Sequence, residues 1–173
     1  SDGKVGIGTT SPSNYHSSLN NLVIASSGDS GITIASGTSS EGSVAFADGT
    51  SGPDAYRGWI NYNHNSNFMR FFTNATEVMR ISSLGTVLVG KTSEGTDTDG
   101  IELNRNDVIV ATRNNDAPLI LNRRTSDGDI TVFRKDNAAV GSIGSGSSGN
   151  EFKWYGSFAS GAGLGVYSNV SIR

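Results

Sequence analysis

The chain alternates short runs of β-branched and aromatic residues with turns rich in Gly, Ser, Asn and Asp, at intervals of about 8–12 residues. Such runs predict β-strands, and the residues between them favour turns. No run has the apolar period of a helix, so we predict an all-β fold. The predicted strands span residues 21–25, 31–36, 43–48, 56–63, 68–74, 78–82, 86–90, 107–113, 118–124, 129–135, 138–144, 151–156 and 164–168.

Each predicted strand carries one narrow apolar stripe. In one of them Ile130, Val132 and Arg134 face one way, while Thr131 and Phe133 face the other. A two-stranded hairpin with such a stripe is marginally stable in water, because covering the stripe takes more strands or a partner. Only 35% of the residues are hydrophobic, so we expect neighbouring chains to supply the missing cover.

Composition excludes several classes of protein. The 173 residues carry 13 Lys and Arg against 16 Asp and Glu without long runs of either sign, which argues against binding to nucleic acid or to an anionic membrane. Cysteine is absent, so the chain has neither disulfides nor a thiolate metal site. No apolar run has the length of a membrane span, so membrane insertion is not expected.

One sequence pattern occurs twice, as GKVGIGTTSPS at 3–13 and as GTVLVGKTSEG at 85–95. The strand-like segment 77–85 precedes the second copy, and nothing equivalent precedes the first. We therefore expect this chain to be a piece of a longer one. The predicted organisation is the end of a preceding repeat unit at 1–13, a first β-repeat unit at 14–95 and a second at 96–173. A coincidental pair of Gly-rich strands is the alternative.

Three phrases carry a family resemblance: KVGIGTTSPS at 4–13, the stretch from 47 to 85, and LNRRTSDGDITVFRKDNAAVGSIG at 121–144. They resemble distal segments of bacteriophage tail fibres and tailspikes, of the type found upstream of an endosialidase-type intramolecular chaperone. The resemblance covers almost the whole chain, but nothing in it resembles the chaperone itself.

The resemblance implies an elongated, repetitive β structure that forms a parallel homotrimer with interwoven strands, like a β-prism or a triple-stranded β-helix. It implies a structural and adhesive role in host-surface recognition and attachment. The partners would be two more copies of the chain, other virion tail proteins and a host cell-surface glycan or outer-membrane receptor. Such a protein is made in the bacterial host cytoplasm and is extracellular, on the virion tail, after release.

Two alternatives remain, a polysaccharide-cleaving tailspike segment and a bacterial trimeric adhesin stalk. Glycoside hydrolysis needs two carboxylates across a sugar-binding groove. Asp54 and Glu77 are available, whereas Asp48, Asp127 and Asp129 are expected in Gly-containing turns. We expect no catalysis and no cofactor.

Metal binding is not expected either. Only two histidines occur, and the TDTDG sequence at 96–100 lacks the further ligands of a calcium loop.

Exposed aromatic residues next to polar ones are the candidates for receptor or glycan binding. The alternative is that these aromatics fill a trimer interior. The candidates are Tyr56, Arg57, Trp59, Tyr62 and His64, with a second group at Trp154 and Tyr155.

The strands of the repeated pattern are the candidates for packing on a three-fold axis. Small residues there allow three chains to approach closely. The packing residues would be Val5 and Ile7 in the first copy and Val87 and Val89 in the second. Leu88 would then face outward or into a neighbouring chain.

Overall fold

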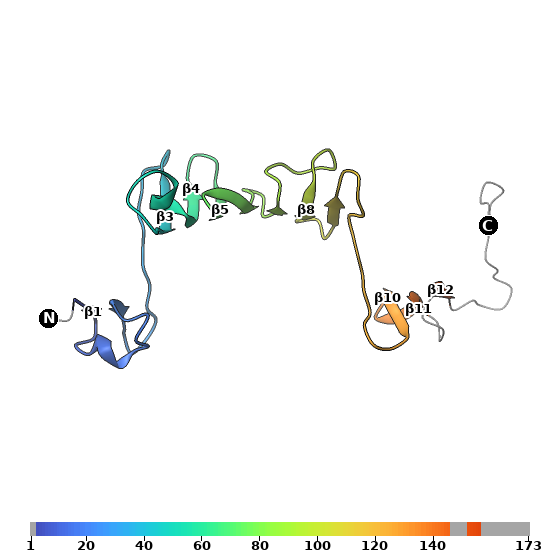
Figure 1. Ribbon diagram of the computed structural model, residues 1–173, viewed down its shortest axis with the longest axis horizontal. Helices are drawn as coiled ribbons and strands as arrows, with labels where there is room; N and C mark the ends of the chain where they lie inside the picture. Colours follow the sequence, from blue (N-terminus) through green and yellow to red (C-terminus); the bar gives the residue numbers. More distant parts are fainter. Residues whose placement is uncertain (1–2, 146–151, 157–173) are drawn as a thin grey trace. The chain divides into compact units, whose positions relative to one another are not determined.

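The computed structural model describes residues 3–145 and 152–156, and it divides into two units, Ser1–Arg113 and Asn114–Arg173. Within the described ranges every regular element is a β-strand except two short 3-10 turns, η1 (Pro12–Asn14) and η2 (Gly52–Tyr56) (Figure 1). The predicted all-β class is therefore confirmed.

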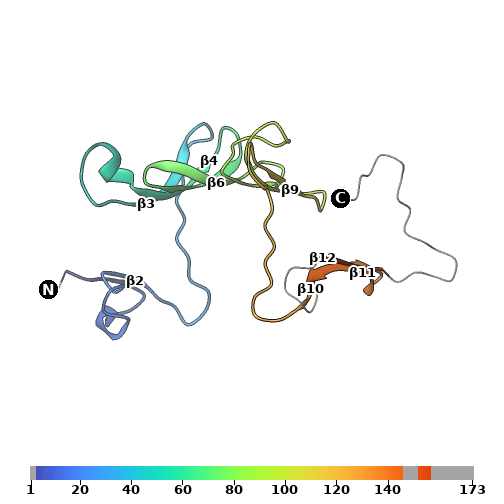
Figure 2. The same ribbon diagram turned by 45° about the vertical axis from the view of Figure 1, so that its right-hand side comes forward.

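The first unit contains a parallel pair and a larger antiparallel sheet. The pair joins β1 (Val5–Ile7) to β2 (Leu22–Ile24). The larger sheet has seven strands that follow one another in chain order as an open meander (Figure 2). Its strands are β3 (Glu41–Phe46), β4 (Gly58–Asn63), β5 (Phe68–Thr73), β6 (Thr76–Ile81), β7 (Val87–Val89), β8 (Gly100–Leu103) and β9 (Ile109–Thr112).

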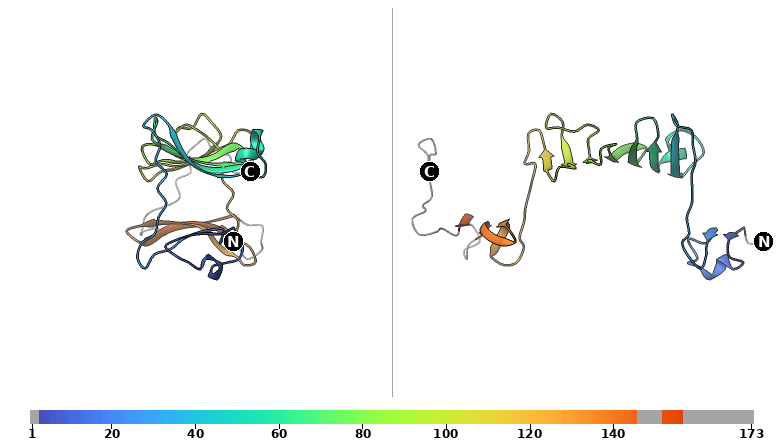
Figure 3. Two further views of the ribbon diagram at one scale, coloured as in Figure 1. Left: turned by 90° about the vertical axis from the view of Figure 1, so that its left-hand side faces the viewer. Right: turned by 180° about the vertical axis from the view of Figure 1, so that it is seen from behind.

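The second unit contains one antiparallel sheet of β10 (Gly128–Lys135), β11 (Ala138–Ser145) and β12 (Phe152–Gly156). The β10–β11 hairpin is drawn in orange in Figure 3. Its turn residues Asp136 and Asn137 have φ of 50° and 66°, and Asp and Asn tolerate this conformation better than most residues. None of the described sheets closes into a prism or solenoid.

Most predicted strands are present, but two predictions are wrong. Residues 31–36 and 118–124 belong to no strand, because an alternating sequence becomes a strand only where a hydrogen-bonding partner lies beside it. Strand β8 was not predicted, since it directly follows a long run of turn residues. The predicted strand at 164–168 lies outside the described residues.

The two copies of the repeated pattern adopt the same local backbone. Gly3 and Gly85 have φ of 73° and 89°, and Gly8 and Gly90 have φ of 75° and 72°. Each three-residue strand is therefore bracketed by glycines in the left-handed region, which other residues rarely adopt. The pairing differs, because β1 lies parallel to β2 whereas β7 is antiparallel to β6 and β8.

The first unit has almost no apolar core of its own. Val23 and Leu88 are the only buried apolar side chains in the described part of the chain, with 6% and 1% exposed. The expectation that Leu88 faces outward or into a neighbour is wrong. It stands between Arg80 and Glu102 in the sheet and is covered within its own chain.

Replacing Leu88 by Ala should lower the free energy of unfolding by about 2–5 kcal/mol, because it removes a fully buried side chain and leaves a cavity. Urea unfolding followed by fluorescence measures this. Val108→Ala is the control, since Val108 is 51% exposed and should change stability little. Equal effects of the two substitutions would contradict the burial of Leu88.

Candidate functional site

The register of the seven-stranded sheet places apolar side chains in two cross-strand rows on one face, which we call the apolar face. Successive strands pair so that one residue per strand continues each row. The first row is Val44, Ile60, Phe71, Met79, Val89, Ile101 and Ala111. The second begins beside Gly42 and is Tyr62, Met69, Ile81, Val87, Leu103 and Ile109.

Six of the thirteen side chains in the two rows of the apolar face are exposed in the single chain, and the other seven are half-buried. Ile109 is 75% exposed, Val44 is 48% exposed and Ile101 is 46% exposed. Monomeric soluble proteins rarely expose contiguous apolar patches larger than a few hundred Å². Because this face crosses seven strands, it is a candidate surface for association.

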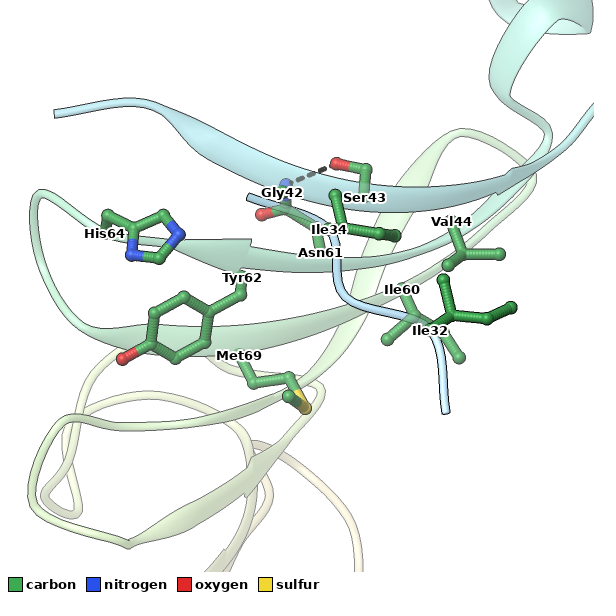
Figure 4. Close-up of a pocket in the computed structure, with 10 residues that line it drawn as sticks. All are labelled: Ile32, Ile34, Gly42, Ser43, Val44, Ile60, Asn61, Tyr62, His64 and Met69. Atoms are coloured by element: carbon green, nitrogen blue, oxygen red, sulfur yellow. Dashed lines mark hydrogen bonds between the residues drawn. The ribbon is translucent and has the colours of Figure 1, made fainter. Parts of the chain in front are cut away.

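Residues 31–36 lie over one end of the apolar face and extend it. Ile32 and Ile34 reach toward Val44 and Ile60 and enclose a groove of about 280 Å³ with them (Figure 4). Cγ2 of Ile34 lies only 3.5 Å from the position that a Cβ atom would take at Gly42. The segment therefore crosses the face of the sheet at this point.

The opposite face carries polar groups that satisfy one another. Asn61 is 1% exposed and donates from Nδ2 to Ser43 Oγ at 2.9 Å and to Glu41 Oε2 at 3.0 Å. Arg70 donates to Asn61 Oδ1 at 2.9 Å and forms an ion pair with Glu41 at 2.5 Å. Hydrogen bonding from Asn63, together with the Arg70 charge, lowers the pKa of Glu41 despite partial desolvation.

The guanidinium groups of Arg70 and Arg80, the two arginines of this face, lie over aromatic rings. The Arg70 guanidinium lies 5.2 Å from the ring centres of both Phe68 and Phe72, and that of Arg80 lies 4.7 Å from Phe68. Glu77 accepts two hydrogen bonds from Arg80, at 2.5 and 2.8 Å. The charges of this face are thus paired within the chain.

A buried ion pair closes the β7–β8 loop. Lys91 Nζ lies 3.5 Å from Glu102 Oε2, and their side chains are 1% and 3% exposed. Glu102 also accepts from Asn104 Nδ2 at 2.8 Å and from the Gly95 N–H at 2.9 Å, while Lys91 donates to the Gly95 carbonyl. The hydrogen bonds from Asn104 and Gly95, with the Lys91 charge, lower the pKa of Glu102.

Sequence analysis missed this pair. Lys91 and Glu102 are separated by a turn-rich stretch with no regular period, and only the β7–β8 register brings them together. The one available signal was Glu102 itself, which lies between apolar residues. A carboxylate is rarely buried without a charged partner, so this position could have indicated that a cation lies nearby.

Acid should destabilise the protein through Glu102. A carboxyl group with a lowered folded-state pKa contributes stability above its unfolded pKa, and that contribution is lost as the pH falls through the folded-state pKa. Glu102→Gln should therefore lower the urea midpoint at about pH 6 and have a smaller effect at about pH 3. Asp97→Asn, on the same loop but exposed, is the matched control. An equal loss at both pH values would contradict the ionic role of Glu102.

The candidate receptor-binding residues fall into two groups on opposite faces of the sheet. Trp59 stacks on Tyr56 at 5.4 Å and meets Phe72 edge-on at 4.7 Å. Tyr62 lies on the apolar face, 4.9 Å from the His64 ring, and both line the groove. His64 begins the β4–β5 turn.

Arg57 is bound by neighbouring loops. It donates to Asp48 at 3.3 Å, to Asp54 at 2.5 Å and to Asn74 at 3.0 Å. For Trp154 and Tyr155 only the backbone pairing with Ile143 and Ser142 is described.

The candidate catalytic carboxylates also have partners within the chain. Asp48 and Asp54 bind Arg57, as described above, and Glu77 binds Arg80. Asp127 accepts from Ser145 Oγ at 3.0 Å, and Asp129 accepts from Ser142 Oγ at 2.6 Å. Asp129 lies within β10, which confirms the predicted strand at 129–135 and makes its expected place in a turn wrong. The described residues contain no group of three or more metal-ligating side chains.

Trp59→Ala should lower the free energy of unfolding by about 2 kcal/mol, because the indole packs between Tyr56 and Phe72 and is partly buried. Thermal unfolding and a glycan array on the same variant separate packing from binding. Unchanged stability with lost glycan binding would contradict this packing role and favour a receptor contact. Tyr15→Ala, an exposed aromatic outside the sheet, is the control.

Comparison of the chain with protein-family models, with curated proteins and with solved structures finds no match. In the part of the chain that the structure describes, no helix is long and apolar enough to cross a membrane.

Proposed function

We propose that the chain is a structural and adhesive segment of a phage tail fibre that works as a parallel homotrimer in host-cell attachment. The observation that carries this proposal is the uncovered apolar face. A fibre segment of this kind needs no deep single-chain core, because three copies cover one another. The resemblance of residues 4–13, 47–85 and 121–144 to tail fibres supports the same function.

The pairing of polar groups on the polar face favours the apolar face as the surface through which the chains of the trimer contact one another. Asn61 and Glu102 are already buried and bonded within one chain, so association there would gain little. On the apolar face each covered side chain gains roughly 25 cal/mol per Å² removed from water. Three equivalent faces around a rotation axis bury one another in a closed assembly.

The proposed axial residues fit this arrangement. Val87 and Val89 belong to the two apolar rows, and Val89 is 39% exposed. Val5 and Ile7, on the equivalent strand of the repeat, are 54% and 55% exposed. Both repeat copies thus offer a pair of apolar side chains, of which Val87 is half-buried in the single chain and the other three are exposed.

In this proposal attachment uses residues outside the trimer contact. Tyr56 is 38% exposed and lies beside Arg57, a combination suited to stacking on a sugar ring and bonding its hydroxyls. The expected ligand is a host cell-surface glycan or an outer-membrane receptor, and the fibre would join other virion tail proteins.

The test is the mass of the protein in solution. Light scattering should give three times the 18.0 kDa chain mass, and Val89→Asp or Ile101→Asp should prevent assembly, because each buries a carboxylate in an apolar contact. Val108→Asp is the matched control, since Val108 is exposed and lies outside both rows. A monomeric wild-type protein, or an SDS-resistant trimer of Val89→Asp, would contradict the proposal.

A further inference from the structure

Residues 31–36 and 118–124 have the sequence of strands but none of the hydrogen bonds. Ile32 and Ile34 are 70% and 47% exposed, and Leu119, Ile120 and Leu121 are between 51% and 78% exposed. No backbone–backbone hydrogen bond within the described residues involves either segment. Figure 2 draws the links from β2 to β3 and from β9 to β10 as plain tube without arrows.

Both segments stand at the same place in the fold, directly before the first strand of an antiparallel sheet. Residues 31–36 precede β3, and residues 118–124 precede β10. Among the residues that the structure describes, β3 and β10 are edge strands, and one side of each has no neighbouring strand in its sheet. Free edges of this kind accept an extended segment by backbone hydrogen bonding.

Local contacts hold each segment in a position where its backbone does not pair with its own edge strand. Ser40 N–H donates to the Gly37 carbonyl at 2.9 Å, and Ile34 lies over Gly42 on the face of the sheet. Arg123 donates from Nε to the Ser126 carbonyl at 2.8 Å and from Nη1 to the Asp129 carbonyl at 3.2 Å. Among the described residues of one chain, neither segment therefore forms backbone hydrogen bonds with β3 or β10, although the Arg123 side chain contacts the start of β10.

We propose that residues 31–36 and 118–124 become strands only between copies, each adding to the β3 or β10 edge of a neighbouring chain. This inference rests on the proposed homotrimer. The occupant is a second copy because every chain offers one donor segment directly before each of the edge strands β3 and β10, so donor segments and these two edges occur in equal number. Two different patches in equal number form a heterologous contact, which closes into a ring when the rotation allows it.

A strand added at the β3 edge would lie next to the apolar face, which is the proposed trimer contact. Ile32 and Ile34 already form one surface with Val44 and Ile60 at the groove. A donor segment beside β3 therefore brings its isoleucines to the same apolar surface, while Thr33 points to the other side, as Ala45 does in β3.

Engineered cysteines test the pairing, since the chain has none of its own. Two differently tagged chains are co-expressed, one with Thr33→Cys and the other with Ala45→Cys, and a second pair uses Ser43→Cys as the acceptor. Neighbouring strands place such residues within the 4.4–6.8 Å that a disulfide allows between Cα atoms. We expect a disulfide between the two tags in non-reducing gels for one acceptor, and none with Ser66→Cys, in the β4–β5 turn.

Hydrogen exchange on the unmodified protein is the second measurement. The amides of 31–36 and 118–124 should exchange at least tenfold more slowly in the trimer than in monomeric Val89→Asp. A trimeric mass with no inter-tag disulfide and freely exchanging segments would overturn the strand exchange and leave the proposed trimer standing. A monomeric wild-type mass would overturn both.

Discussion

The first unit depends on an asymmetry in which the charged groups on the polar face of its sheet are paired within one chain, whereas the apolar face is only partly covered. Desolvated polar groups must find hydrogen-bond partners, and Asn61, Arg70 and Glu41 find them across β3, β4 and β5. Apolar side chains need only to leave water, and no particular partner is required within the chain. The sheet therefore fixes its strand register through polar contacts while its apolar rows stay open.

Strand pairing explains how much could be predicted from the sequence. The hairpin of β4 and β5 was readable, because both strands have strong β-formers around the turn 64–67. Residues 31–36 have a comparable pattern but no partner strand, and a pattern of side chains does not reveal which backbone lies alongside. Strand β8 is the opposite case, because it has a partner strand, β7, but no clear strand pattern of its own. Its short sequence directly follows a run of turn residues and was therefore not predicted.

The candidate sites were predictable in part. The repeat identified Val87 and Val89 as an apolar pair, and the structure adds that each belongs to a row crossing the whole sheet. The aromatic cluster was treated as one group because its members are close in sequence, yet Trp59 and Tyr62 differ by an odd number of positions along β4 and so face opposite sides. The Lys91–Glu102 pair depends on a contact between strands that no local pattern encodes.

The paired charges of the polar face have a kinetic consequence. Their partners all lie in one chain, so the meander can acquire its register in a first-order step before any second chain arrives. In the proposed trimer, covering the apolar rows requires an encounter between chains, and the rate of that step rises with concentration. Under this proposal, folding of the chain precedes assembly, and the folded single chain would be most prone to aggregation between the two steps.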